Sequence, residues 1–326
     1  MNLKIINKRK YFYIISGILF VVSILSFISW GLKLGIDFTG GSLLEVDYVA
    51  DRPAIEAIRT DLADLNLEGL NIQPIGDKGF MMRFKEVTEE KHQQILDKLN
   101  GKSTANEGKV TVEGPADATV SVDTTTATST DKIIEKRFES IGPSIGKELK
   151  TKAFYAIILA SIGIIIYIAI AFRKVSFPVA SWKYGTTAVI ALLHDIVITT
   201  GIFVFLGHFL NIEVNAPFIA ALLTIIGYSV NDTIVVFDRT RENLHKYEGD
   251  FEEIVDQSIR ETLGRSINTL VTVELALFAL LVFGGATITD FVLALTIGIL
   301  FGGYSSIFVA TALLVSWHRF DEKLKS

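Results

Sequence analysis

The chain has 326 residues, of which 50% are hydrophobic and 21% charged, and its formal net charge is −5. It contains no cysteine, which excludes disulfides, thiolate metal sites and thiol catalysis. No contiguous basic tract stands out, which argues against nucleic acid as a partner. The charged residues lie between long apolar stretches, so the composition predicts an integral membrane protein.

Six apolar runs approach the roughly 20 residues that a helix needs to cross about 30 Å of hydrocarbon. These runs are 11–32, 153–172, 184–206, 216–237, 266–284 and 291–316. The apolar core of the first run is too long for a signal peptide, and no small-residue cleavage site follows it. We therefore expect an uncleaved signal anchor followed by five further transmembrane helices.

The distribution of lysine and arginine predicts the orientation in the membrane. Basic residues lie in segments 1–10, 173–183, 239–264 and 317–326, whereas the loops 207–215 and 285–290 contain none. With alternating crossings, every basic segment falls on one side, which the positive-inside rule assigns to the cytoplasm. We expect both termini in the cytoplasm and residues 33–150 outside it.

Residues 33–150 have the pattern of a small α/β domain. Residues 42–49 alternate like a strand, 54–65 and 88–99 have helical spacing, and short strands flank the turn at 77–79. Residues 132–142 are a candidate last strand. The resulting order, βαββαβ, is that of ferredoxin-like domains. The threonine-rich segment 103–130 is poor in large apolar residues, and we expect it to be a flexible insertion.

The basic segment 239–264 alternates acidic and basic residues. This pattern predicts a cytoplasmic pair of amphipathic helices, either interfacial or re-entrant, that is broken at Gly249. His92 and His245 lie in polar segments, so we expect both side chains to be solvated. The fold class expected from the whole chain is a six-helix transmembrane bundle with a small extracytoplasmic α/β domain.

Ionisable residues inside the predicted spans are functional candidates, because a charge at the bilayer centre costs roughly 2.5–3.5 kcal/mol on insertion scales. Asp232 lies six residues before Asp238, at the edge of its span, and therefore about 9 Å inside. Arg265 begins the fifth span, and Thr269 follows one helical turn deeper. We expect Asp232, Arg265 and Thr269 to share one layer of the membrane.

A carboxylate in this layer could alternate between a neutral protonated form and an ionised form paired with Arg265. The simpler alternative is a static ion pair, or an Asp232 bonded to neighbouring backbone. Asp195 and Glu274 are two further candidates for a proton path. For Asp195, which follows His194, a polar contact between helices is an equally good interpretation.

The sequence shows no sign of enzyme chemistry. No serine or threonine has a histidine base at suggestive spacing, and the five histidines are scattered. Metal-ligand spacing and a phosphate-binding glycine loop are also absent from the sequence. We expect neither a metal nor another cofactor.

Four motifs together resemble the SecF protein-export family. They are GIDFTGG (35–41), ALLHD (191–195), GYSVNDTIVVFDRTREN (227–243) and ETLGRSINTLVT (261–272). The resemblance implies pairing with SecD, a related six-span protein, in a twelve-helix unit of the resistance-nodulation-division type with pseudo-twofold symmetry. It further implies an accessory to the SecYEG channel and SecA in a bacterial or archaeal plasma membrane. Such a subunit uses the proton-motive force to assist late translocation and release of secreted polypeptides.

The resemblance also assigns roles to individual residues. Asp232, Arg265 and Thr269 match the family's proton-path positions, and the partner subunit would supply a further carboxylate. The motif at 35–41, with Asp37, Gly40 and Gly41, matches the hinge-side entry to the outer domain. Three positions depart from the family pattern: Leu270 and Val273 replace small polar residues, and Glu274 replaces an apolar residue. Glu274 therefore either adds a protonatable site or accompanies a thinned relay.

Two other functions remain compatible with the sequence. One is half of a proton-coupled exporter of lipids or small molecules, and the other is a scaffold that holds SecD and the channel together without moving protons. Because the chain starts with its own signal anchor, we expect SecD to be a separate polypeptide.

Overall fold

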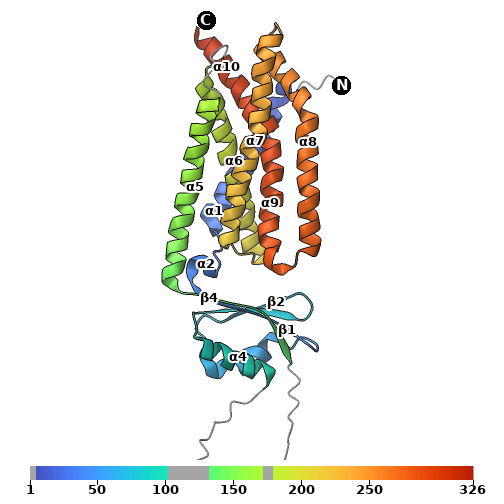
Figure 1. The fold of residues 1–326 in the computed structure, drawn as a ribbon. Helices are drawn as coiled ribbons and strands as arrows, with labels where there is room; N and C mark the ends of the chain where they lie inside the picture. Colours follow the sequence, from blue (N-terminus) through green and yellow to red (C-terminus); the bar gives the residue numbers. More distant parts are fainter. Residues whose placement is uncertain (1–4, 102–131, 172–178, 326) are drawn as a thin grey trace, which may run out of the picture. The chain divides into compact units, whose positions relative to one another are not determined.

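The computed structural model describes residues 5–101, 132–171 and 179–325 (Figure 1). The chain divides into two compact units, a helical unit formed by Met1–Gly35 with Glu148–Ser326, and a unit containing the sheet formed by Ile36–Lys147. The elements of the helical unit are η1 (Ile6–Lys8), α1 (Arg9–Trp30), α5 (Pro143–Ala171), α6 (Ser181–Leu210), α7 (Ala216–Lys246), α8 (Phe251–Phe283), α9 (Ala286–Ser305), η3 (Ser306–Ala310) and α10 (Thr311–Lys325).

Six helical segments of the described chain are long and apolar enough to cross a membrane, which agrees with the six spans predicted from the sequence. They are Ile6–Trp30, Pro143–Ile168, Ser181–Leu210, Ala216–Lys246, Phe251–Phe283 and Ile288–Leu324. Figure 1 places both chain ends at the same end of the helical unit, as an even number of crossings requires.

Helix α9 contacts α6, α7 and α8, and α1 packs against α6. The approach of α7 and α9 is close because α9 has glycines there. A Cβ atom on Gly298 would lie 2.1 Å from Ile225 Cδ1, and one on Gly302 would lie 3.1 Å from Ser229 Cβ. Small residues let helix backbones approach in this way in membranes. The close contact places polar side chains of α6, α7 and α9 within hydrogen-bonding reach.

The helical character of 239–264 and its break at Gly249 agree with the prediction, but the two helices are not an interfacial or re-entrant pair, because they are the ends of α7 and α8. Helix α7 continues to Lys246 and α8 begins at Phe251, so only residues 247–250, which include Gly249, break the helical path. The reason is that the segment after Gly249 has its own buried face, formed by Phe251, Val255 and Ile259. That face joins the core of the bundle, and the charged residues extend the transmembrane helices.

Helix α5 begins ten residues earlier than the span predicted at 153–172. Pro143 stands at its first position, where the missing N–H group is tolerated. Residues 143–150, assigned from the sequence to the outer domain, therefore form the first turns of this helix.

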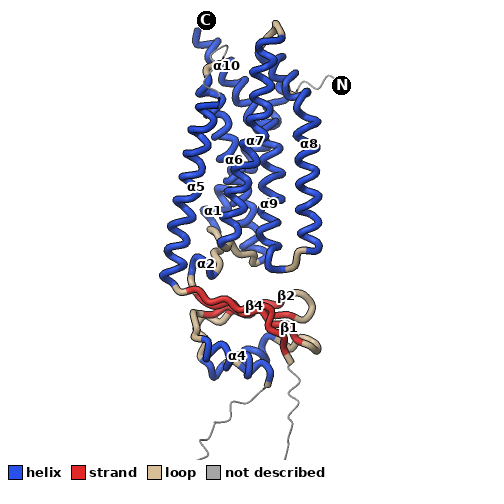
Figure 2. Tube along the Cα trace, viewed as in Figure 1, coloured by secondary structure: helices blue, strands red, loops and turns tan. Residues whose placement is uncertain are grey.

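The unit Ile36–Lys147 has the predicted βαββαβ order. Its elements are α2 (Ile36–Thr39), β1 (Gly41–Tyr48), α3 (Ile55–Asp61), η2 (Ala63–Leu65), β2 (Asn71–Ile75), β3 (Gly79–Phe84), α4 (Glu89–Asn100) and β4 (Ile133–Ile141). The strands form one antiparallel sheet in the order β2-β3-β1-β4 (Figure 2). Alternate residues of β1 and β3, such as Leu44 opposite Met82 and Val46 opposite Phe80, are buried on one face.

The prediction that His92 is solvated is wrong. Its ring is 4% exposed and stacks on Phe138 of β4, with 3.7 Å between ring centroids. His92 shares its face of α4 with the buried residues Ile95 and Leu99. His245, in contrast, is exposed as predicted. The predicted insertion at 103–130 lies outside the described residues.

Candidate functional site

Polar residues of α7 and α8 line a groove along the seam between these two helices. Its volume is about 360 Å³. The lining residues are Tyr228, Asn231, Asp232 and Val235 of α7 with Arg265, Asn268, Thr269, Thr272 and Val273 of α8. Within each helix these positions recur three and four residues apart, so they lie on one helical face. The three residues predicted to share a layer, Asp232, Arg265 and Thr269, all line this seam groove.

Asp232 is buried, with 8% of its surface exposed, and its hydrogen bonding is incomplete. Its Oδ1 accepts a hydrogen bond of 2.7 Å from Ser266 Oγ on α8. Its Oδ2 has no hydrogen-bond partner within the described part of the chain. An ionised carboxylate in an apolar setting normally requires several donors or a cation. The unsatisfied oxygen is therefore positioned to bind a proton or a mobile donor.

Arg265 lies near Asp232 but does not form the static ion pair that was the simpler alternative for this layer. The guanidinium is close enough to act on the carboxylate electrostatically, yet no ion pair joins the two side chains in the described chain. The side chain of Arg265 is exposed, so it has room to move. The Thr269 hydroxyl donates within α8, to the carbonyl oxygens of Arg265 at 2.9 Å and Ser266 at 3.0 Å.

Ser266, which binds Asp232, is a residue that the sequence reasoning missed. It lies directly after Arg265 and is buried against α7, whereas the side chain of Arg265 is exposed. The sequence indicates a functional role of Ser266 only weakly, because serine is also a common packing residue in membrane helices. Its predicted depth in the membrane, which is the same as that of Asp232, is the feature of the sequence that could have indicated the contact between the two.

Asp195 forms a second buried polar cluster, at the contact of α6, α7 and α9. It is 0% exposed. Its Oδ2 accepts hydrogen bonds from Ser229 at 2.6 Å and Ser305 at 2.7 Å, and its Oδ1 lies 3.0 Å from His194 Nδ1. The structure thus shows the polar contact between helices that was one of two interpretations of Asp195. Sequence reasoning did not identify Ser229 or Ser305.

A π-helical turn follows this cluster at once. Residues Ser306–Ala310 form the turn η3, and Ser306 Oγ donates to the carbonyl of Ser229 at 3.1 Å. Thr233 Oγ1 donates to Ser306 Oγ at 2.9 Å. Single π-turns in long helices frequently accompany functional sites. The consecutive serines at the start of this turn thus bind different helices, because Ser305 donates to Asp195 of α6 and Ser306 to Ser229 of α7.

Glu274 is not among the residues that line the seam groove. Its side chain is half-buried, and Oε1 is buried without a hydrogen-bond partner in the described chain. It lies close enough to Tyr228 to interact with it electrostatically. The structure therefore places Glu274 beside the groove, on the same helix as Arg265.

The glycines at 40–41 have a structural requirement that other residues do not meet. Gly40 has φ 74° and Gly41 has φ 128°, both in the region that favours glycine. A Cβ atom on Gly40 would lie 2.8 Å from Pro143 Cα, and one on Gly41 would lie 2.9 Å from Phe84 O. Asp37 lies in the preceding helical turn α2. Because Gly40 and Gly41 have no side chains, the start of β1 can lie close to Pro143 of α5 and to Phe84 of β3.

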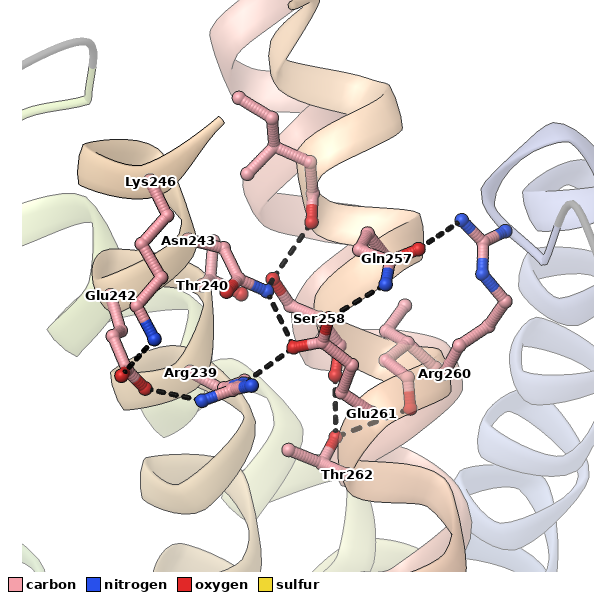
Figure 3. A network of polar contacts seen from close by, with 12 residues as sticks. Arg239, Thr240, Glu242, Asn243, Lys246, Gln257, Ser258, Arg260, Glu261 and Thr262 are labelled. Atoms are coloured by element: carbon pink, nitrogen blue, oxygen red, sulfur yellow. Dashed lines mark hydrogen bonds and ion pairs between the residues drawn. The ribbon is translucent and has the colours of Figure 1, made fainter. Parts of the chain in front are cut away.

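A charged network joins α7 and α8 at the end of the bundle that carries both termini (Figures 1 and 3). Glu261 accepts hydrogen bonds from Arg239 Nε at 2.5 Å, Asn243 Nδ2 at 2.9 Å and Gln257 Nε2 at 2.6 Å. Arg239 also donates to Glu242 at 2.5 Å. The network satisfies both carboxylate oxygens of Glu261.

No group of three or more metal-ligating side chains is present among the described residues. The chemistry available in the seam groove is therefore that of a buried carboxylic acid, hydroxyl groups and a mobile guanidinium. These groups can take up, hold and release a proton.

The comparison with protein families decides which of the sequence-based expectations holds. The family described as "Protein export membrane protein SecD/SecF, C-terminal" matches residues 121–320, and "SecD/SecF GG Motif" matches residues 26–50. The chain belongs to the SecD/SecF protein-export family. The second match covers Asp37, Gly40 and Gly41, and the first includes Asp195, Asp232, Arg265 and Thr269.

Relatives within the SecD/SecF family are similar over nearly the whole chain. The protein translocase subunit SecF of Thermobaculum terrenum is 40% identical, with 97% of this chain and 94% of the relative covered. The SecF subunit of Anaerolinea thermophila is 36% identical, with the same shares covered. These matches confirm the SecF resemblance that the motifs indicated.

Longer members of the SecD/SecF family contain a region that is similar to this chain. The subunit SecDF of Bacillus subtilis is 33% identical over 95% of this chain but only 37% of its own length. The crystal structure of SecDF, a translocon-associated membrane protein from a Thermus species, matches with a TM-score of 0.75 and 29% identity, and covers 96% of this chain and 38% of that chain. The chain spans less than two-fifths of SecDF. In these two SecDF proteins, the region similar to this chain is part of a longer polypeptide.

Proposed function

We propose that this chain is the SecF-type subunit of the Sec protein translocase that, together with SecD, uses the proton-motive force to assist late translocation and release of secreted proteins. The similarity to SecF subunits over nearly the whole chain supports the auxiliary role in the translocase. The same similarity favours this function over that of half of a lipid or small-molecule exporter. The SecYEG channel, SecA and secreted polypeptides are the further partners in this proposal, in a bacterial or archaeal plasma membrane.

The observation that carries the proton-coupled part is the state of Asp232. The carboxyl group is buried in a membrane helix, with one hydrogen bond from Ser266 and an oxygen without a partner in the described chain. A neutral, protonated Asp232 is compatible with this environment, and an ionised one is compatible only when Arg265 or water approaches. Proton binding and release at Asp232 therefore require different arrangements of α7 and α8.

We further propose that both termini face the cytoplasm and that the unit Ile36–Lys147 faces the outer side. The basic segments predicted to be cytoplasmic support this orientation. They lie at both chain ends and around the turn between α7 and α8, which Figure 1 shows at the same end of the helical unit. Protons driven inward would then leave Asp232 toward the end of the bundle that carries the Arg239–Glu261 network.

The test replaces Asp232 with asparagine in cells that depend on this gene, and measures export of a secreted reporter protein. Asp232→Asn keeps the acceptor for Ser266 but cannot exchange a proton, so export falls to the level of the deletion strain. The matched control is Asp250→Asn, the same change at an exposed position in the turn before α8, which leaves export unchanged. Undiminished export by Asp232→Asn would rule out proton coupling at this site.

A second measurement separates proton coupling from a scaffold that only holds SecD and the channel together. Membrane vesicles with the reconstituted complex of this chain and SecD are given a proton gradient, and its decay is followed with a pH-sensitive dye. Asp232→Asn abolishes the flux that depends on the complex, while SecD still co-purifies with the variant. Equal proton flux in the parent and the variant would favour the scaffold.

A further inference from the structure

A second groove continues the seam between α7 and α8 beyond Asp232, toward the end that carries both termini. Its volume is about 380 Å³. We name it the exit groove; its lining residues are Ile234, Val235, Asp238, Arg239 and Glu242 of α7 with Glu261, Thr262 and Arg265 of α8. Asp232 does not line this groove, whereas Arg239 and Glu261, which are bonded to each other, do (Figure 3).

The two grooves share Val235 and Arg265. On α7, Val235 lies one turn beyond Asp232, and Arg239 lies one turn beyond Val235. On α8, Arg265 lies one turn from Glu261. At 1.5 Å per residue, the seven residues from Asp232 to Arg239 span about 10 Å along the helix axis. A path of this length along one seam therefore leads from the buried carboxyl group to the charged end of the bundle.

We propose that protons leaving Asp232 pass through the exit groove, and that the Arg239–Glu261 ion pair is the gate of this path. The inference rests on the proposed function, since it concerns the route of the same protons. When the pair is formed, it holds α7 against α8 across the groove. When it opens, water in the exit groove accepts the proton: the O–H bond of Asp232 breaks, and Asp232 is left as a carboxylate.

The bonding of Glu261 explains why the closed state is stable. Its Oε2 accepts from Arg239 and Asn243 of α7, and its Oε1 accepts from Gln257 of α8. Charge-assisted hydrogen bonds of this kind are stronger than neutral ones. With all three donors in place, Glu261 is the ionised partner of Arg239 and does not serve as a proton-binding site.

The position of the ion pair explains why it can open. The side chains of Arg239 and Glu261 are 33% and 20% exposed, and Arg239 lies two residues beyond the predicted span 216–237. Glu242 offers Arg239 a second carboxylate at 2.5 Å, and it is itself paired with Lys246 at 2.6 Å. Arg239 can therefore release Glu261 and keep its ion pair with Glu242. The ionic link between α7 and α8 is then broken.

Arg265 makes the passage depend on the state of Asp232. Its guanidinium lines both grooves, and none of the described carboxylates forms an ion pair with it. After Asp232 loses its proton, the new negative charge attracts the guanidinium of Arg265 toward Asp232 within the seam groove. The positive charge on that side then opposes the return of a proton from the exit groove.

The test uses the complex of this chain with SecD in membrane vesicles, and the variant Glu261→Gln. Glutamine keeps the size of the side chain but loses the ionic attraction to Arg239. The expected result is a rise in passive proton leak above that of the parent, because the closed state loses the ionic link between α7 and α8. Adding Asp232→Asn to Glu261→Gln returns the leak to the background. Arg239→Lys, which keeps the charge, leaks less than Glu261→Gln.

The absence of cysteine in the chain allows a second readout that does not depend on proton flux. Val235→Cys places a thiol at the boundary of the two grooves, and a membrane-impermeant thiol reagent is added on the cytoplasmic side. Labelling is slow in the parent background and faster with Glu261→Gln, while Asp250→Cys labels rapidly in both. Unchanged leak and unchanged labelling in Glu261→Gln would overturn the gate, even if Asp232→Asn abolishes export. Failure of the proposed function itself appears instead as undiminished export by Asp232→Asn.

Discussion

Ser229 Oγ donates a 2.6 Å hydrogen bond to Asp195 Oδ2, and Ser229 stands one helical turn before Asp232 on the same helix. One segment of α7 therefore serves two buried carboxyl groups. Asp195 is held by two serines and a histidine from three helices, whereas Asp232 has a single donor. The fully bonded carboxyl group is suited to fix the helices, and the poorly bonded one is suited to exchange a proton.

The bonding of Asp195 predicts that two substitutions at this position affect thermal stability differently. Ser229 and Ser305 both donate to Oδ2, so Asp195→Asn keeps both bonds through its amide oxygen. We expect its export and thermal stability to stay close to the parent. Asp195→Ala leaves both hydroxyl groups buried without an acceptor, at a cost of about 1–3 kcal/mol. Its midpoint of thermal unfolding in detergent therefore falls. Loss of export by Asp195→Asn at normal stability would instead assign Asp195 to the proton path.

The sequence predicted the six spans and the order of the sheet domain well, because both depend on local patterns. The length of an apolar run decides whether a helix can span the membrane, and alternation decides where strands lie. The pairing of β1 with both β3 and β4 then follows from the βαββαβ order. None of these conclusions required knowledge of how two helices turn relative to each other.

The side-chain partners in the site could not be predicted in the same way. Helix rise gives the depth of Asp232 and Arg265, but their contact depends on the rotation of α7 against α8. That rotation brings Ser266, and not Arg265, onto Asp232. The burial of His92 likewise depends on β4, which follows in the sequence only after residues 102–131.

Removal of the hydrogen bond from Ser266 to Asp232 is expected to reduce export in part. Ser266→Ala leaves Asp232 without its hydrogen-bond donor, and export slows by about tenfold at most, because a hydrogen bond between neutral groups contributes roughly 0.5–1.5 kcal/mol. Ser266→Thr keeps the hydroxyl group and restores export. The measurement is the rate of reporter export in the complemented strain. Export by Ser266→Thr that is as slow as export by Ser266→Ala would contradict the assignment of this effect to the hydroxyl group.

The two-glycine motif predicts a steric effect that can be separated from backbone strain. Gly40 and Gly69 have φ values of 74° and 73°, so alanine costs roughly 1–2 kcal/mol of backbone strain at either position. Only Gly40→Ala also places a Cβ atom 2.8 Å from backbone, at Pro143 Cα, because nothing lies within 4 Å of the Cβ position of Gly69. We expect Gly40→Ala to speed trypsin cleavage within residues 36–147 of the full chain more than Gly69→Ala does. Equal cleavage rates would show that only backbone strain matters.

The phenol of Tyr48 predicts how the sheet domain responds to alkaline pH. Burial beside Phe80, aided by the negative charge of Asp61, raises the pKa of Tyr48 to about 12. An unfolded chain has a tyrosine pKa of about 10, so the folded state favours the neutral phenol. Its contribution to stability is fully present below pH 10 and is lost as the pH rises from about 10 to about 12. Because the side chain is about half exposed, we expect this contribution to be about 1 kcal/mol. Denaturant unfolding of the full chain, followed by cleavage within residues 36–147, measures it at pH 9 and pH 11. The parent loses more stability than Tyr48→Phe over this interval, and an equal loss in both would contradict the assignment.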